Sequence, residues 1–269
     1  MKNDRRNGKR PEYRNWVPFS MVLGLGLGTA LALAGTVIAG LRLQGKPRLI
    51  CMGIFGAGTL VLLGFTVWMA ALHRAFDYRG KRRLAAAIIA GTAAHVKLPE
   101  GGMGLDVGCG SGALTIRCAK NNPKAQMVGC DIWSGSYKVV FSKRLCEENA
   151  EAGGVSNVRF TEGNAVHLPF ASGTFDAVTS NYVYHNIPSR NRQDLLRETL
   201  RVLKKGGTFA IHDLMEPGRY GDMEAFMRSL REEGYEEVQL IDTTDGTFMG
   251  KREAALLGLG GSALLTGRK

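Results

Sequence analysis

The sequence lacks the features that would point to a disulfide-stabilised or zinc-binding protein. Its five cysteines are an odd number, and none are spaced as Cys-x-x-Cys or combined with histidine in a metal-ligand pattern. Proline is scarce, at 8 of 269 residues, and the 36 glycines follow no collagen period. With 45% hydrophobic and 22% charged residues, the chain is neither disordered nor fibrous. We therefore expect a folded protein and predict no metal site.

Acidic residues are scarce in the N-terminal third. Residues 1–83 carry 14 Lys and Arg against 3 Asp and Glu, whereas residues 84–269 carry 21 of each. The whole net charge of +11 therefore belongs to the first third. A pI of 9.6 can indicate nucleic-acid binding. Here, however, the positive charges flank apolar runs and do not decorate a folded face, so we predict no nucleic-acid partner.

Two long runs contain no charged residue and no histidine. Val17–Leu41 is 25 residues long and Leu49–Leu72 is 24. Each exceeds the roughly 20 residues that cross the hydrocarbon of a bilayer as a helix. Within lipid, runs of this length satisfy their backbone hydrogen bonds as helices. The sequence therefore predicts a transmembrane α-helical hairpin over residues 16–73, with the lipid bilayer as a partner and a tight turn at residues 42–48.

Positive charge around the two runs predicts their orientation. A basic tail, residues 1–15, precedes the hairpin and a basic linker, residues 74–83, follows it, whereas the turn is less basic. The positive-inside rule then places both termini in the cytoplasm, in a cell-membrane protein that crosses twice. Gly24 and Gly28 form a GxxxG pair, so the helices could pack closely or form a homo-oligomer. Cleavage of the first run as a signal peptide, at residues 32–34, stays open as an alternative.

Residues 84–269 read as one α/β domain. Short apolar strands alternate with helical segments, which is typical of βαβ units in a mainly parallel, doubly wound sheet. Ligands of such sheets bind outside the carboxyl ends of the strands. The predicted strands are 103–107, 125–130, 158–161, 175–180, 208–212, 238–241 and 263–266, and the predicted helices are 84–96, 113–120, 137–152, 190–203, 223–233 and 251–257.

A glycine-rich turn follows the first predicted strand. It reads Asp106-Val-Gly108-Cys109-Gly110-Ser-Gly112. Glycines permit the sharp turn and let the backbone approach a ligand, and the helix that follows offers free N–H groups to a carboxylate. Asp106 would repel a pyrophosphate but suits an ammonium group. The turn is therefore expected to bind an amino acid.

Polar residues at the ends of the next two strands extend this site. Asp131 ends the second strand, where an acid can accept hydrogen bonds from two ribose hydroxyls. Ile132 and Trp133 could cover an adenine face, and the amide of Asn164 could read the adenine edge. An amino acid joined to a ribose and an adenine describes S-adenosylmethionine (SAM).

Five blocks of sequence follow one another along the predicted α/β domain: Leu105–Gly112, Gly129–Asp131, Gly163–Phe170, Thr174–Ser180 and Leu203–Phe209. Together they resemble a known family, the class I SAM-dependent methyltransferases, in particular the ubiquinone/menaquinone-biosynthesis (type 11) group. The resemblance covers residues 84–269 and implies a Rossmann-like sandwich of seven strands whose last strand is antiparallel. Where the family usually reads Asp-Ala, this chain has Asn164-Ala165, which should preserve the adenine contact.

The segment after the fourth strand lies beside the sulfonium in this family. The resemblance implies that Asn181 and Tyr182 contact the methionine portion. His185 is the candidate general base, because its unperturbed pKa is near neutral. Tyr184 is predicted to orient the acceptor. His212-Asp213, at the end of the fifth strand, could reach the acceptor or support the residues that do.

The acceptor is not legible in the sequence, but the hairpin restricts where it is found. We expect a small, apolar or membrane-associated molecule: a lipid, a quinone, or a hydrophobic thiol or phenol. A membrane-anchored SAM sensor or scaffold without transferase activity is the alternative from another class. An NAD-dependent dehydrogenase is less consistent with the residues, because the turn is not G-x-G-x-x-G.

Overall fold

The computed structural model describes residues 10–134 and 140–269. The chain forms two compact units: Asn15–Ala85, and the described residues up to Arg14 together with Ala86–Lys269. The basic tail is therefore divided from the hairpin at Arg14 and grouped with the α/β domain. Four basic tail positions and the predicted helix start Tyr137 lie outside the described residues; the four are Lys2, Arg5, Arg6 and Lys9.

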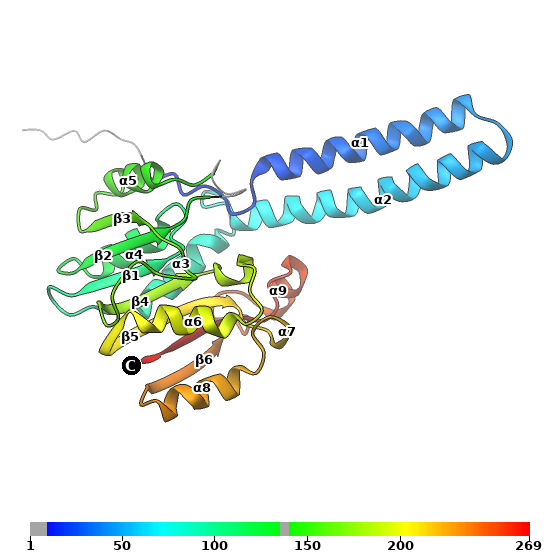
Figure 1. Ribbon diagram of the computed structural model, residues 1–269. Helices are drawn as coiled ribbons and strands as arrows, with labels where there is room; N and C mark the ends of the chain where they lie inside the picture. The colour runs from blue at the N-terminus through cyan, green and yellow to red at the C-terminus, as the bar shows by residue number, and fades with distance from the viewer. Residues whose placement is uncertain (1–9, 135–139) are drawn as a thin grey trace, which may run out of the picture. The chain divides into compact units, whose positions relative to one another are not determined.

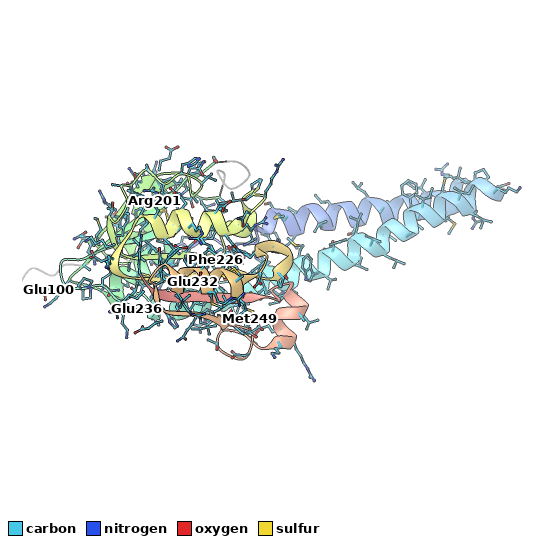
Figure 2. All side chains as sticks on the ribbon, turned by 60° about the horizontal axis from the view of Figure 1, so that its bottom comes forward. Glu100, Arg201, Phe226, Glu232, Glu236 and Met249 are labelled. Atoms are coloured by element: carbon cyan, nitrogen blue, oxygen red, sulfur yellow. The ribbon has the colours of Figure 1, made fainter. Side chains whose placement is uncertain are left out.

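The unit of Asn15–Ala85 is a helical hairpin. Its helices are α1 (Phe19–Arg42) and α2 (Gly45–Phe76), and both are long and apolar enough to cross a membrane by length and composition. Their apolar side chains point outward along both helices (Figure 2). The helices pack closely at Gly35, where a Cβ would lie 2.8 Å from the Phe55 ring. Gly28 also faces α2, whereas a Cβ on Gly24 would meet no described atom within 4 Å.

The connection between the two helices is shorter than the sequence predicts. Only Leu43 and Gln44 separate α1 from α2, so Gly45 and Pro47 belong to the first turn of α2 and not to a loop. Proline is tolerated there because the first N–H groups of a helix have no intrahelical partner. The helical segment therefore extends through Lys46 and Arg48.

The α/β unit is built on one seven-stranded sheet with the order β3-β2-β1-β4-β5-β7-β6. The first five strands pair in parallel, and β7 pairs antiparallel with both β5 and β6. The expected seven strands with an antiparallel last strand are thus confirmed. The strands are β1 (Met103–Val107), β2 (Gln126–Asp131), β3 (Val158–Glu162), β4 (Phe175–Asn181), β5 (Leu203–Leu214), β6 (Glu236–Asp242) and β7 (Ser262–Arg268).

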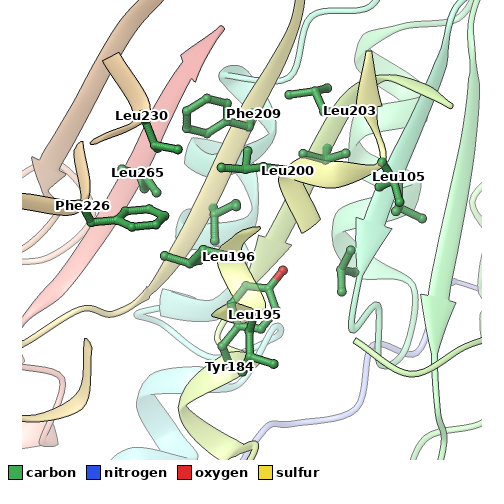
Figure 3. Packing of buried hydrophobic residues seen from close by; sticks show 14 of the residues in the cluster. Leu105, Tyr184, Leu195, Leu196, Leu200, Leu203, Phe209, Phe226, Leu230 and Leu265 are labelled. Atoms are coloured by element: carbon green, nitrogen blue, oxygen red, sulfur yellow. The ribbon is translucent and has the colours of Figure 1, made fainter. Parts of the chain in front are cut away.

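Helices cover both faces of this sheet (Figure 1). Leucines of α6 (Arg192–Arg201) and the apolar side of α8 (Met223–Glu232) form the main core with the sheet residues on one face, as Figure 3 shows. A smaller cluster joins α4 (Ala113–Asn121) to α5 (Lys143–Ala152) on the other face. The remaining helices are α3 (Leu84–Ala94), the 3-10 turn η2 (Tyr184–Asn186), α7 (Pro217–Tyr220) and α9 (Lys251–Leu257).

The predicted boundaries are wrong at two places, each for a local reason. The helix predicted from residue 137 is observed as α5 from Lys143, because Ser142 caps it by accepting a hydrogen bond from Leu145 N at 3.2 Å. The helix predicted to run to residue 203 ends at Arg201, and β5, predicted from residue 208, begins at Leu203, so the glycines expected to stop the helix lie inside the strand. Gly206 has a φ of +79° there, in the stretch of β5 where the pairing with β4 shifts register.

The strand order fixes where a ligand can bind. From β1 the chain proceeds outward to β2 and β3, and it then returns to place β4 on the other side of β1. At such a reversal the loops after the two central strands diverge and leave a crevice at their carboxyl ends. The loops after β1 and β4, residues 108–112 and 182–188, therefore flank the expected binding position.

The close packing of α3 makes a specific prediction. A Cβ on Gly91 would lie 2.0 Å from Phe248 Cε1, so Gly91→Ala should lower the free energy of unfolding by about 1–3 kcal/mol. Gly218→Ala is the matched control, because its Cβ would meet no described atom within 4 Å and alanine favours the helix. Denaturant titration of the detergent-solubilised chain measures both. Equal stability of the two variants would contradict the described packing.

Candidate functional site

The loop Gly108–Gly112, called here the cofactor loop, connects β1 to α4. Gly108, Gly110 and Gly112 have φ values of +72°, +55° and +81°, which L side chains rarely adopt. A Cβ on Gly108 would also lie 2.4 Å from Val183 Cγ2, in the loop after β4. The predicted glycines are therefore required by the backbone itself, and they bring the loops after β1 and β4 into contact.

Asp131, at the carboxyl end of β2, joins the cofactor loop to the second strand. One carboxylate oxygen accepts a hydrogen bond from Gly110 N and the other from Trp133 N, both at 2.9 Å. Each oxygen keeps lone pairs for a further donor. Trp133 has a φ of +39°, and its indole N–H donates to Gly110 O at 3.0 Å. Two backbone donors thus hold the carboxylate in a fixed direction beside the loop.

Asp106 is more deeply buried than the sequence leads us to expect for an acid that contacts a ligand. Its side chain is on the opposite face of β1 from the main core, only 1% of the residue is exposed, and it accepts a hydrogen bond from Thr115 Oγ1 at 2.6 Å. Burial raises the pKa of Asp106 to about 7. The hydrogen bonds from Thr115 lower the pKa and so oppose this shift, whereas the charge of Asp131 adds to it. A cationic group near Asp106 would favour its ionised form.

The residues predicted to contact adenine lie at the ends of β2 and β3. Ile132 is 47% exposed, so an apolar surface is available beside Asp131. Trp133 is half-buried against the cluster of α4 and α5. Asn164 is exposed, with its side-chain oxygen accepting from Val166 N at 2.9 Å, while Ala165 packs against the main core. Gly163 N donates to Asp131 O at 3.0 Å, which brings this segment next to the end of β2.

Asn181 ends β4 and Tyr182 follows it, beside a buried histidine. The side-chain oxygen of Asn181 lies 2.8 Å from His212 Nδ1, and Tyr182 pairs its hydroxyl with Ser262 Oγ at 2.7 Å. Burial lowers the pKa of His212 to about 3, and its second ring nitrogen lies 2.9 Å from Thr243 Oγ1. His212 is therefore neutral and fully engaged, so it supports Asn181 and is not placed to act as a base.

His185 is paired with a buried carboxylate. Its Nδ1 lies 2.5 Å from Asp213 Oδ1, with the side chain of His185 19% exposed and that of Asp213 fully buried. Burial opposes the ionisation of Asp213, but hydrogen bonding and charge from His185, together with further donors, outweigh it and lower the pKa of Asp213. Those donors are Tyr184 N, His185 N, Leu214 N and Tyr220 OH.

The other predicted catalytic residue, Tyr184, is not at the surface of the site. It is fully buried among the leucines of α6, and its hydroxyl lies 2.6 Å from Thr199 Oγ1 (Figure 3). Burial raises the pKa of its phenol. The structure gives Tyr184 a packing role and, through its backbone N–H, a hydrogen bond to Asp213. We therefore assign it no contact with an acceptor.

Comparison with known proteins relates part of this chain to methyltransferases. The family described as "Methyltransferase domain" matches residues 105–211, which include the cofactor loop, Asp131 and His185. The demethylmenaquinone methyltransferase of Bacillus subtilis (strain 168) is 29% identical over 171 residues, covering 60% of this chain and 70% of that protein. The erythromycin 3''-O-methyltransferase of Saccharopolyspora erythraea is 31% identical, covering 56% of each chain.

Solved structures support the fold. The 4+2 cyclase SpnF superposes with a TM-score of 0.54 at 24% identity, covering 72% of this chain and 85% of that one. A geranyl diphosphate methyltransferase, solved with GPP and sinefungin, gives 0.51 at 17% identity, covering 71% and 82%. The geranyl diphosphate C-methyltransferase of Streptomyces coelicolor A3(2), with a TM-score of 0.51 at 17% identity, was solved with S-adenosyl-L-homocysteine bound. Residues 105–211 of this chain form a methyltransferase domain.

Three residues of this methyltransferase domain were missed or left undecided by the sequence. Tyr220 lies in α7, a helix of four residues that is too short to show a periodic pattern. Thr115 lies between two apolar residues of α4, and nothing in this local sequence marks it as a partner of Asp106. Asp213 was noted only as one of two possibilities at the end of β5. An acid directly after a strand of this sheet was the available signal for Asp213, and only the fold shows which side chains surround it.

The raised pKa of Asp106 predicts a pH-dependent effect on stability. Between about pH 4 and 7 the folded methyltransferase keeps a proton that the unfolded chain releases, so this group lowers stability progressively as the pH rises. The stability of Asp106→Asn relative to the wild type should rise by on the order of 1–3 kcal/mol between pH 5 and pH 8, because asparagine forms no buried charge as the pH rises. Thermal melting without SAM, at both pH values, measures the difference; a gap independent of pH would contradict the shift.

Proposed function

We propose that this protein is a membrane-anchored methyltransferase that transfers the methyl group of SAM to a small, apolar acceptor carrying a proton that must be removed. The cofactor loop and Asp131 hold SAM, and His185 receives the acceptor proton. The observation that carries the proposal is the pairing of His185 Nδ1 with Asp213 Oδ1 at 2.5 Å. His185 belongs to the loop after β4, which contacts Gly108 through Val183.

The residues around the cofactor loop fit SAM. Asp131 offers two fixed oxygens to ribose hydroxyls, and the N-terminus of α4 offers N–H groups to the amino-acid carboxylate. Asp106 suits the ammonium group, since a cation would favour its charged form. The exposed Ile132 provides an apolar face for adenine, with Asn164 and Ala165 at its edge and Asn181 and Tyr182 toward the methionine end.

His185 has the arrangement of a general base. Because Nδ1–H donates to the Asp213 carboxylate, the neutral ring carries its lone pair on Nε2. None of the residues that the structure describes is hydrogen-bonded to Nε2. Asp213 holds the ring in this tautomer and stabilises the imidazolium that forms when a proton arrives, as in other His–Asp pairs. Bound SAM supplies an electrophilic methyl group, and the chain itself aligns the acceptor and removes its proton.

A base of this kind favours an acceptor with an acidic proton. A phenol, a hydroquinone or a hydrophobic thiol meets this requirement, and such molecules partition into membranes. The names of the relatives support a small-molecule acceptor, because demethylmenaquinone and erythromycin methyltransferases are both named for one. The two apolar helices support anchoring of the enzyme at the membrane, where an apolar acceptor is concentrated.

Removing the base should slow methyl transfer and leave SAM binding intact. We expect His185→Ala to lower kcat about 10²- to 10⁴-fold with the Kd of SAM changed less than threefold. Tyr220→Phe, which removes one donor to Asp213, should lower kcat by a smaller factor. A membrane extract is incubated with the enzyme and SAM, and untargeted mass spectrometry identifies the methylated product. The value of kcat is then measured as the rate at which this product forms.

His167→Ala is the matched control, because its exposed side chain is assigned neither to SAM nor to proton transfer, and alanine keeps the backbone N–H that donates to Asn164 O at 3.0 Å. It should keep the wild-type rate. Added imidazole should restore part of the rate of His185→Ala, since a free base can then accept the proton. A wild-type rate in His185→Ala would show that His185 is not the base. SAM binding without any methylated product would favour the alternative, a SAM sensor or scaffold without transferase activity.

Anchoring is tested separately. The full chain should remain in the membrane pellet after washing with 1 M salt or at alkaline pH and should be released only by detergent. For the orientation, Gln44→Cys between the two helices should react with a membrane-impermeant maleimide added to intact cells, whereas Lys269→Cys should not; the unsubstituted chain gives the background. Release by salt alone, or labelling of Lys269→Cys only, would contradict the proposed topology.

A further inference from the structure

The chain segment Arg10–Arg14, called here the strap, is bound to the α/β unit by a side chain far away in the sequence. Asn149 of α5 accepts a hydrogen bond from Glu12 N at 2.6 Å and donates one to Glu12 O at 3.2 Å. Both backbone polar groups of Glu12 are thus paired with a single amide. The four residues 15–18 separate the strap from α1.

The same amide reaches the cofactor loop. Asn149 also donates to Ser111 O at 3.0 Å, and Ser111 lies between Gly110 and Gly112. Only 2% of Asn149 is exposed, so its hydrogen bonds are made away from water, where loss of a partner is costly. One buried side chain therefore connects the strap to the loop that we assign to SAM.

Tyr13 makes a second link between the strap and the loop. Its ring packs on the cluster formed by Cys109, Ile116 and neighbours on α5, with Trp133 at the same cluster. Burial raises the pKa of Tyr13 to about 12, so the phenol is neutral at physiological pH. Gly110 O accepts hydrogen bonds from Trp133 Nε1 at 3.0 Å and from Cys146 Sγ at 3.1 Å. The strap therefore packs on the same cluster as Trp133 and Cys146, which hydrogen-bond to the cofactor loop.

We propose that Tyr13 and Asn149 are positioning residues for SAM: strap docking holds the cofactor loop in its binding geometry, and the two events are coupled. This inference rests on the proposed assignment of SAM to the cofactor loop. Neither residue is placed in contact with SAM or with the acceptor, so their effect is on cofactor affinity and not on the chemical step. Because coupling is reciprocal, bound cofactor must also hold the strap.

The first test measures affinity and turnover separately in the full, detergent-solubilised chain, with S-adenosylhomocysteine as the titrant. Asn149→Ala and Tyr13→Ala should each raise its Kd about 5- to 50-fold. In both variants kcat at saturating SAM should stay within twofold of wild type. Tyr13→Phe keeps the ring and should recover most of the affinity. Glu148→Ala, at an exposed position of the same helix, should bind like wild type.

The second test uses the reciprocal effect on the strap. Trypsin cleaves after Arg14, at the end of the strap, whereas the Arg10–Pro11 bond resists it. Saturating S-adenosylhomocysteine should slow the cleavage after Arg14 at least fivefold in the wild type. In Asn149→Ala the cleavage should be faster without ligand, and the protection should be reduced.

The outcomes separate this inference from the site assignment. If Asp131→Ala weakens binding while Asn149→Ala and Tyr13→Ala do not, and the ligand leaves cleavage after Arg14 unchanged, the strap inference is overturned and the site stands. If the wild type fails to bind S-adenosylhomocysteine, or Asp131→Ala has no effect, the site assignment fails. Should Asn149→Ala not fold, Tyr13→Ala and the wild-type cleavage rates decide.

Discussion

The approach of two loops at Gly108 is the constraint on which the rest of the site depends. Residue 108 has no room for a Cβ, because Val183 lies where that atom would be. Ser180 Oγ also donates to Val107 O at 2.8 Å, so the ends of β1 and β4 are joined just before the loops begin. This contact brings the side of the domain that we propose to bind SAM, around Asp131, next to the side that we propose to bind the acceptor, around His185.

Positions near this contact tolerate unusual backbone conformations. Tyr182 and Trp133 have positive φ values, of +53° and +39°, although neither is glycine. Such conformations persist where the surroundings determine them strongly, and they gather at ligand sites. Trp133 is held by Asp131 and Gly110, and Tyr182 by His212 O and Ser262. The hydrogen bonds that fix the site therefore also offset local strain.

Much of the fold and the glycine turn after β1 could be predicted from the sequence. Local signals, such as apolar runs bounded by glycine and proline, placed β1 within its observed bounds and the other strands within a few residues, except that β5 begins at Leu203 and not at residue 208. The turn Gly108–Gly112 was legible because its backbone requires glycine. The misassigned Gly206 shows the limit: glycine marks a left-handed position, but only strand pairing decides whether that position ends a helix or forms a bulge.

Residues whose role depends on distant partners were not predictable. Tyr184 and His185 are neighbours in the sequence, yet one is fully buried and the other faces the site, because η2 turns between them. Asn149 and Glu12 are 137 residues apart, and no pattern relates them. The likeness to a cyclase and to methyltransferases alike shows that this fold does not fix the reaction, so the assignment of roles depends on these side chains.

The most direct test of the central claim is where the cofactor binds. Hydrogen–deuterium exchange of the full chain, with and without saturating S-adenosylhomocysteine, reports this residue by residue. We predict slower exchange for the backbone amides of Gly108–Gly112 and Asp131–Trp133, at the carboxyl ends of β1 and β2. Saturable binding that leaves both segments exchanging as in the free protein would contradict the account.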